Sequence, residues 1–314
     1  MAKYWISGGA GTLGRELTRQ LYPTANRIVI YSRDECKHAE MRQEFPEGPP
    51  GPMRYRVGDI RDIDRMRIAM ADCNIVVHAA ALKRIDTCES EVYECMETNI
   101  IGTANVAKLC NEPGIDRAVF VSTDKACSPI SAYGASKSFS EHLWIQSNNY
   151  GNCEFIALRY GNVRGSRGSL HALWEGMTGQ MLSVTHPDMT RFFWSIEEAA
   201  KFIEWAIHNG ERGLLYIPKM RGYKIMDIAK EYSDKIKIVG LRTNEKIDEE
   251  LISISELGQA TDQGERYALY PTRHEWTTDL RRTGDPVNSP VTSADKLLVY
   301  KLNGEIVMDS NMRR

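Results

Sequence analysis

The junction between the first apolar segment and the first amphipathic segment constrains the fold of this chain most. Segment 4–7 is apolar, segment 13–21 has helical periodicity, and three glycines lie three residues apart where they meet. Gly8 permits a tight turn, Gly11 lets the backbone approach a pyrophosphate, and Gly14 allows close helix packing. Free amides at the helix start would face the phosphates. This strand–turn–helix pattern predicts a dinucleotide site with the contacts Gly8, Gly11, Thr12, Leu13 and Gly14.

Short apolar runs alternate with helical patterns over the first 160 residues, and the alternation weakens afterwards. Such alternation implies a parallel sheet that helices cover on both faces. We therefore expect an α/β fold, a Rossmann doubly wound parallel sheet with a smaller C-terminal substrate-binding lobe. Residues 1–160 would bind the nucleotide and carry the catalytic residues. Residues 161–314 would mainly form the lobe, a discontinuous unit with some segments returning to the first domain.

The individual elements follow from the same patterns. The expected strands cover 4–7, 27–31, 54–57, 75–78, 118–122, 154–158 and 214–217, and the expected helices cover 13–21, 34–45, 62–71, 93–110, 132–149, 195–208 and 224–234. The region from residue 264 onward has weak periodicity. At its end, 297–300 and 305–308 are expected to form a hairpin around Asn303-Gly304.

Composition narrows the class of protein. The formal net charge of −2 argues against a broad nucleic-acid surface. No apolar run approaches the roughly 18 to 20 residues of a membrane span, and the first residues run straight into a strand, so we expect no signal peptide and no membrane association. The seven cysteines include no CxxC pair. We expect reduced thiols in a cytoplasmic protein without a metal site.

The end of the second expected strand bears on the choice of cofactor. An NAD site usually places an acidic residue there, whereas this chain has Ser32 and Arg33, with Lys37 one turn later. A hydroxyl and a guanidinium suit a 2′-phosphate, so NADP is favoured, although Asp34 leaves NAD possible. Further contacts are predicted where later strands end: Asp59 and Ile60 near the adenine, Ala79, Ala80 and Ala81 beneath the cofactor, and Lys83 at a phosphate or the substrate.

Two acid/base couples follow the fifth expected strand. Tyr133 and Lys137 lie four residues apart and would share one helix face, where an ammonium favours the phenolate. That pair suits removal of an alcohol proton while a hydride leaves the same carbon. Asp124 and Lys125 form a second couple that a simple alcohol dehydrogenase would not need. Alternatively, Asp124 and Lys125 form a solvated charge pair and Tyr133 is a half-buried aromatic residue.

These motifs, taken in order, resemble the extended short-chain dehydrogenase/reductase family, and within it the inverting UDP-N-acetylglucosamine 4,6-dehydratases. The resemblance covers roughly residues 3–255 and rests on SGGAGTLG, YSRDE, HAAALKRIDTCE, NIIGTANV, STDKACSPISAYGASK, LRYGNVRGSRGS, MTRFFWS, IPKMRGYKIMDIA and GLRTNEKIDEE. It implies an NADP-dependent reaction on a UDP-sugar with no net redox change. NADP would be tightly bound and recycled within each turnover.

The resemblance implies a role for each residue of the two couples. Tyr133, assisted by Lys137, would be the base for oxidation at sugar C4. Lys125 would remove the C5 proton and Asp124 would protonate the departing C6 hydroxyl. Protonation of C5 from the opposite face would give a 4-keto-6-deoxy-L-sugar nucleotide. Thr123 would hydrogen-bond the substrate near C4.

Other positions are implied more loosely. Asn99 matches a family asparagine near the active-site strand, or is a helix-interior amide bonded to backbone. Further cofactor contacts implied are Ser122, Tyr160, Asn162 and Val163, with Asn162 also at the substrate, and the candidate clamps for the UDP diphosphate are Arg167, Arg191 and Arg242. The sequence departs from the family pattern at Arg84, Asp86, Arg164 and Asp248, which puts the identity of the sugar in question.

Three alternatives remain open. A retaining 4,6-dehydratase often has methionine in place of Tyr133 and a membrane-spanning extension. A UDP-sugar 4-epimerase would not need Asp124 and Lys125. A non-catalytic NADP-sensing protein could use the same fold. Family analogy also implies a homo-oligomer, a dimer or larger, whose interface would involve helices 93–110 and 132–149.

Overall fold

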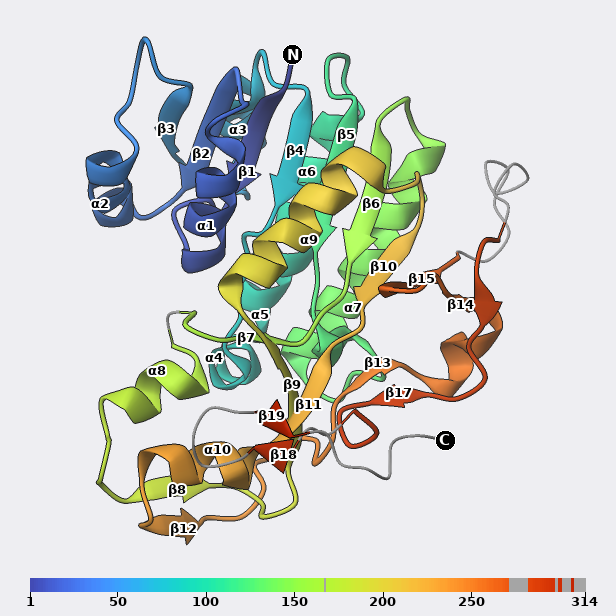
Figure 1. The fold of residues 1–314 in the computed structure, drawn as a ribbon. Helices are drawn as coiled ribbons and strands as arrows, with labels where there is room; N and C mark the ends of the chain where they lie inside the picture. Colours follow the sequence, from blue (N-terminus) through green and yellow to red (C-terminus); the bar gives the residue numbers. More distant parts are fainter. Residues whose placement is uncertain (167, 271–281, 297–298, 301–305, 308–314) are drawn as a thin grey trace.

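A large twisted sheet forms the centre of the molecule (Figure 1). The computed structural model describes residues 1–314 except 167, 271–281, 297–298, 301–305 and 308–314. In spatial order the strands are β16 (Asp285–Pro286), β14 (Ala260–Asp262), β15 (Arg266–Leu269), β10 (Leu215–Pro218), β6 (Glu154–Leu158), β5 (Arg117–Val121), β4 (Ile75–His78), β1 (Lys3–Ser7), β2 (Arg27–Ser32) and β3 (Met53–Val57). Strands from β10 to β3 run parallel, which confirms the predicted Rossmann fold.

Helices cover both faces of this sheet. On one face α1 (Thr12–Leu21) packs against α9 (Ile196–Asn209), and on the other α6 (Gly102–Cys110) packs between α3 (Ile63–Met70) and α7 (Ala132–Gln146) (Figure 1). The helix α2 (Glu35–Glu44) follows β2, with Asp34 as its N-cap accepting a hydrogen bond from the Lys37 amide. Because every βαβ connection returns to the same sheet edge, the loops after β1, β2, β4, β5 and β6 converge.

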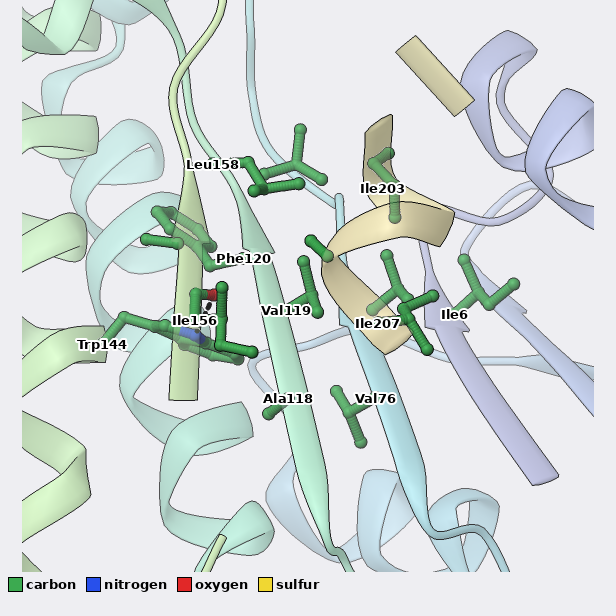
Figure 2. Packing of buried hydrophobic residues seen from close by; sticks show 14 of the residues in the cluster. Ile6, Val76, Ala118, Val119, Phe120, Trp144, Ile156, Leu158, Ile203 and Ile207 are labelled. Atoms are coloured by element: carbon green, nitrogen blue, oxygen red, sulfur yellow. Dashed lines mark hydrogen bonds between the residues drawn. The ribbon is translucent and has the colours of Figure 1, made fainter. Parts of the chain in front are cut away.

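Alternating side chains of the strands build the core between these layers (Figure 2). Val119 of β5 faces Ile203 and Ile207 of α9, whereas the next residue, Phe120, points to the opposite face and stacks on Trp144 of α7. The Trp144 indole donates to the carbonyl oxygen of Ile156 at 3.1 Å. Because both faces of the sheet are buried, the sequences of these strands are continuous runs of apolar residues.

One expected helix, 93–110, is interrupted. It divides into α5 (Val92–Cys95), a π-helical segment η1 (Met96–Ile101) and α6, and the short helix α4 (Ile85–Ser90) precedes it. The π-helical turn contains Asn99, and both Thr103 and Ser140 donate to its backbone carbonyl oxygen. Side-chain bonds to this carbonyl account for the local widening of the helix.

A smaller lobe lies across the carboxyl ends of the parallel strands (Figure 1). It contains a three-stranded sheet of β11 (Arg221–Lys224), β9 (Thr190–Trp194) and β7 (Asn162–Val163), a two-stranded pair of β12 (Ile236–Ile238) and β8 (Leu182–Val184), and the helices α8 (Leu170–Glu175) and α10 (Ile225–Tyr232). Trp174, Phe193, Tyr223 and Ile228 belong to its own apolar core.

The C-terminal region connects the lobe with the large sheet. The strand β13 (Glu250–Ile252) pairs with β17 (Val291–Thr292), a 3-10 helix η4 (Ile254–Gln259) follows β13, and β14 to β16 extend the large sheet antiparallel. Two short strands of the expected terminal hairpin, β18 (Val299–Tyr300) and β19 (Ile306–Val307), pair antiparallel. The Asn303-Gly304 turn lies outside the described residues. Within the described part of the chain, no helix has both the length and the apolar character needed to cross a bilayer.

Candidate active site at the carboxyl edge of the sheet

The loop after β5 brings the first acid/base couple together. Thr123 caps the short 3-10 helix η2 (Asp124–Ala126), and its hydroxyl donates to Asp124 Oδ1 at 2.9 Å. Lys125 Nζ donates to the same oxygen at 2.9 Å. The Asp124 side chain is fully buried, whereas that of Lys125 is 18% exposed. Asp124 and Lys125 are therefore a desolvated, hydrogen-bonded pair and not a solvated surface couple.

A glutamate that sequence reasoning missed completes the surroundings of Lys125. Glu249 Oε1 lies 3.6 Å from Lys125 Nζ and 3.8 Å from Arg191 Nε. Burial lowers the pKa of Lys125, but the charges of Asp124 and Glu249 outweigh it, so the net pKa is raised. The lysine is consequently an ammonium at neutral pH. Glu249 directly precedes β13, and the acidic pair at 249–250 was its only signal in the sequence.

The second couple lies on the first turns of α7. Tyr133 is buried, and that burial raises its pKa to about 12, against the opposing effect of the Lys125 charge. Lys137 Nζ donates to the Val121 carbonyl at 2.7 Å and lies 3.9 Å from the centre of the Phe120 ring. Burial lowers the pKa of Lys137 to about 7. The cation acting on the phenol in this structure is thus Lys125, which differs from the expected effect of Lys137.

Several buried polar atoms at this edge lack a hydrogen-bond partner among the described residues. They are Ser122 Oγ, Asp124 Oδ2, Tyr160 Oη and Glu249 Oε2. Gly161 keeps the space beside Asp124 open, since a β-carbon there would lie 3.2 Å from Oδ2 and 2.5 Å from Phe192 Cβ. Desolvated polar atoms without partners are costly, and a polar ligand would satisfy them. The edge therefore has the chemistry of a binding site for a hydroxyl-rich molecule.

The glycine turn forms a cradle for a dinucleotide. Gly8 has φ +66°, and a β-carbon there would lie 3.0 Å from the Ala80 backbone. A β-carbon on Gly14 would lie 2.3 Å from the Gly9 carbonyl oxygen. Thr12 begins α1 and Gly11 is its N-cap, without a side-chain cap, so the positive end of the helix dipole faces the turn. This geometry fits the pyrophosphate of a nicotinamide cofactor.

Replacing Gly14 by alanine is expected to lower the free energy of unfolding by about 1–3 kcal/mol, because the added methyl group overpacks the turn. Cofactor affinity should fall as well, since the turn must shift. Thermal unfolding and cofactor titration measure both effects. Gly258→Ala is the matched control, since nothing lies within 4 Å of its β-carbon. Equal stability of the two variants would contradict this account of the turn.

Polar and basic residues lie at the ends of β2, β3 and β4. Ser32 Oγ lies 2.8 Å from His38 Nε2, and the exposed Arg33 forms a 3.4 Å ion pair with Asp59. Lys37 pairs with Asp34 at 2.5 Å, and its charge also acts on Lys83. The remaining predicted contacts at this edge are Ile60, which is buried, and Ala79, Ala80 and Ala81, which are partly buried.

Asn99 is anchored to the backbone. Its Oδ1 accepts from the Leu82 amide at 2.8 Å, while Nδ2 donates to the Leu82 carbonyl and to Ser136 Oγ, both at 3.0 Å. These contacts correspond to the second interpretation of Asn99, a helix amide bonded to backbone. They tie the loop after β4 to α7, one turn from Tyr133.

The three candidate arginine clamps lie in different surroundings. Arg191 is buried, and its guanidinium donates to the carbonyl oxygens of residues 190, 246 and 247. Arg242 is exposed, and Arg167 lies outside the described residues. Asn162 and Val163 form β7, where Asn162 Nδ2 donates to the Phe192 carbonyl at 3.1 Å. The guanidinium of Arg191 thus donates mainly to backbone carbonyl oxygens, two of them at 246–247.

The departures from the family pattern divide into two groups. Arg84 and Asp86 form an exposed ion pair at 2.8 Å. Asp248 accepts a 2.5 Å hydrogen bond from Thr190, and the Arg164 guanidinium lies 4.9 Å from the Tyr223 ring centre. Asp248 and Arg164 are partly buried and contact residues of β9 and β11.

Comparison with known proteins shows the family of the chain. The polysaccharide biosynthesis protein family matches residues 5–271. The chain is 38% identical over 277 residues to a UDP-N-acetylglucosamine 4,6-dehydratase (inverting) of Campylobacter jejuni strain 81-176, covering 85% of this chain and 82% of that protein. It is 34% identical over 280 residues to a UDP-glucose 4-epimerase of Rickettsia bellii strain OSU 85-389, covering 84% and 81%.

A solved structure of Pen from Bacillus thuringiensis superposes with a TM-score of 0.85 at 29% identity, covering 93% of this chain and 92% of that one. Both the extent of the family match and the identity to curated relatives exceed what a shared fold alone would give. The chain therefore belongs to the polysaccharide biosynthesis protein family, within the extended short-chain dehydrogenase/reductases that its sequence resembles.

Proposed function

We propose that the protein is a nucleotide-sugar 4,6-dehydratase that converts UDP-N-acetylglucosamine, with inversion at C5, to UDP-2-acetamido-2,6-dideoxy-β-L-arabino-hex-4-ulose. The observation that carries the proposal is the buried Asp124–Lys125 pair beside Tyr133. Oxidation at C4 needs one base, but elimination of the C6 hydroxyl needs a further base and a further acid. The inverting relative at 38% identity supports the same assignment.

The proposed reaction assigns each proton to a side chain. Tyr133 takes the C4 hydroxyl proton, assisted by Lys137 four residues later on α7 and by the charge of Lys125. A bound nicotinamide cofactor would accept the hydride from C4 and return it to C6. The C4 ketone acidifies the C5 proton, which Lys125 removes, and Asp124 donates a proton to the departing C6 hydroxyl. Protonation of C5 from the opposite face then inverts that centre.

Elimination requires Lys125 as a neutral amine and Asp124 as a carboxylic acid, and proton transfer within this hydrogen-bonded pair gives both. Lys125 is an ammonium in the resting pair, because Asp124 and Glu249 raise its pKa. Transfer of one proton along the 2.9 Å hydrogen bond gives a neutral amine and a carboxylic acid. No proton has to enter from solvent, since the net charge of the pair is unchanged. Acid and base then act together on C6 and C5.

We propose NADP as the cofactor, held by the glycine turn and read by Ser32, Arg33 and Lys37. The ionic partners of Arg33 and Lys37, Asp59 and Asp34, lie beside them, so a 2′-phosphate would compete with these carboxylates. The nearby charge of Lys83 adds to the positive potential. A guanidinium and ammonium groups suit a dianionic phosphate better than a ribose hydroxyl.

The double variant Ser32→Asp, Arg33→Ile is expected to move cofactor preference towards NAD, because it adds a carboxylate for the ribose and removes the guanidinium. The ratio of NADP to NAD affinity should fall by about 10- to 100-fold, the size of one or two charged hydrogen bonds. Fluorescence titration with both cofactors measures this ratio, and Arg84→Ala serves as an exposed arginine control. Unaltered NADP affinity would show that Ser32 and Arg33 do not read the phosphate.

We also propose that the protein is a homo-oligomer, a dimer or larger. Apolar side chains of α5, η1 and α7 are exposed, among them Val92, Tyr93, Met96 and Phe139. The helices that carry them contact one another and so present a joint surface. Exposed apolar patches of this kind are typical of interfaces.

Mass spectrometry of the product tests the proposal directly. Incubation of the protein and NADP with UDP-N-acetylglucosamine should yield a product lighter by one water. A UDP-sugar 4-epimerase, the second candidate that the 34% identical relative supports, would give an isomer of unchanged mass. An isomeric product would therefore overturn the dehydratase proposal and favour the epimerase.

A further inference from the structure

Glu249 is a buried carboxylate that neither gives nor takes a proton in the proposed reaction. Its side chain is 5% exposed, and its Oε1 lies 3.6 Å from Lys125 Nζ. Its Oε2 is buried without a hydrogen-bond partner among the described residues. An isolated buried carboxylate costs several kcal/mol unless charge or hydrogen bonds offset it. The Lys125 ammonium is the cation that offsets this cost.

The C-terminal region fixes the backbone of Glu249. The Glu249 amide donates to Ser293 Oγ at 2.9 Å, and the Ser293 amide donates to the Glu249 carbonyl at 2.8 Å. Ser293 is fully buried and also bonds to Thr190 of β9. Gly222 of β11 leaves room for this segment, since a β-carbon there would lie 1.9 Å from the Ser293 carbonyl oxygen. Ser293, which is itself bonded to β9, thus fixes the backbone from which the Glu249 carboxylate extends.

Charged groups surround the Lys125 amine on several sides. Asp124 comes from the loop after β5, Glu249 from the start of β13, and Arg191 from β9. Glu245 Oε1 faces Arg191 Nη2 at 3.8 Å, and Tyr133 of α7 is close enough for its phenol to respond to the Lys125 charge. Among these groups, Asp124 and Glu249 are the carboxylates that form ion pairs with Lys125 within the described chain.

The two carboxylates have different hydrogen-bonding relations to Lys125. Asp124 shares a 2.9 Å hydrogen bond with the amine and can exchange a proton with it. Glu249 lies at ion-pair distance, 3.6 Å, and forms no hydrogen bond with it. A carboxylate in such a position acts through its charge, as the buried acid of a catalytic triad stabilises the cation that forms on its base.

We propose that Glu249 is a positioning residue for the reaction proposed above, orienting Lys125 and stabilising the positive charge that its amine gains on taking the C5 proton. In that step the C5–H bond breaks and an N–H bond forms on Lys125. The electron pair moves from C5 towards the C4 ketone and expels the C6 hydroxyl, which leaves as water with the proton of Asp124. No oxidant or reductant is consumed in this step.

Glu249→Gln tests the role, because glutamine keeps the size of the side chain and the backbone bonds to Ser293 while removing the charge. The rate of C5–H exchange into D₂O should fall by about 10- to 100-fold with little change in KM. Loss of one carboxylate also lowers the pKa of Lys125. The alkaline limb of the kcat/KM profile, where the Asp124–Lys125 pair loses its proton to solvent, should therefore move to lower pH.

Two further variants separate charge from structure. Glu249→Asp keeps the charge and should return the pH limb towards that of the wild type. Glu245→Gln removes a carboxylate that also faces Arg191, and we expect it to leave both the exchange rate and the pH limb unchanged. A Glu249→Gln enzyme with wild-type exchange and an unshifted limb would overturn the role of Glu249 while dehydration by the wild type still supports the proposed function. A wild-type protein that never exchanges C5–H would overturn both.

Discussion

Lys125→Ala is expected to oxidise the sugar at C4 but not to eliminate water. Tyr133 and Lys137 remain in place in this variant, so the absorbance of reduced cofactor should rise on mixing with UDP-N-acetylglucosamine. Without the proposed C5 base, formation of the dehydrated product should fall by about 10²–10⁴-fold. Stopped-flow absorbance and quenched-flow product analysis follow the two steps separately.

The Lys125 variant needs a structural control, because it leaves Asp124 and Glu249 buried without their shared cation. Breaking a buried ion pair costs about 3–5 kcal/mol. The double variant Lys125→Met, Glu249→Gln removes the base and one of the two carboxylates and should fold more stably than Lys125→Ala. Dehydration at the wild-type rate by either folded variant would remove Lys125 from the mechanism.

Tyr133→Phe is expected to stop the reaction one step earlier. The variant loses the hydroxyl that takes the C4 proton, so neither reduced cofactor nor dehydrated product should form, each falling by about 10²–10⁴-fold. Its ring still packs beside Cys88 and Cys95, so folding and cofactor affinity should stay close to those of the wild type. Accumulation of reduced cofactor in Tyr133→Phe would show that another group is the C4 base.

Burial shifts the pKa values of Tyr133 and Lys137 in opposite directions. Burial raises the pKa of Tyr133 to about 12, whereas it lowers the pKa of Lys137 to about 7. The Lys125 ammonium opposes the rise for Tyr133, so the two couples are electrostatically linked. Loss of the Lys125 charge would raise the phenol pKa further. The Lys125→Ala variant should therefore oxidise C4 more slowly than the wild type near neutral pH, though far faster than Tyr133→Phe.

Local patterns in the sequence predicted the parallel half of the fold well. The apolar runs at 75–78 and 154–158 coincide with β4 and β6, because strands buried on both faces need continuous apolar residues. The glycine turn was equally informative, since Gly8 and Gly14 meet steric demands that no other residue satisfies. These features depend on neighbours in the chain, and a single sequence records them directly.

The sequence did not predict features that depend on contacts between residues far apart in the chain. The π-helical turn at Met96–Ile101 arises from bonds that Thr103 and Ser140 make to one carbonyl, which helical periodicity does not encode. Antiparallel β15, at Arg266–Leu269, joins the large sheet through β10 although its own pattern is weak. A strand of four residues is too short for its own pattern to show a clear period.

For the candidate site, too, the sequence indicated residues that are near one another in the chain and missed those that come from distant segments. The sequence could group Asp124, Lys125, Tyr133 and Lys137 because they lie within one loop and one helix. Glu249 comes from a segment more than 100 residues later, and only the paths of β9, β13 and β17 bring it to Lys125. Arginine side chains such as Arg191 could serve phosphate or backbone equally well, and packing decides between those uses.

A proton NMR time course in D₂O with UDP-N-acetylglucosamine and NADP tests inverting 4,6-dehydration most directly. We expect loss of the C6 hydroxymethyl signal, growth of a C6 methyl signal, and deuterium at C5 in the L-configuration. A C4 epimer whose C5 proton is retained, or a C6 methyl product with the D-configuration at C5, would contradict it.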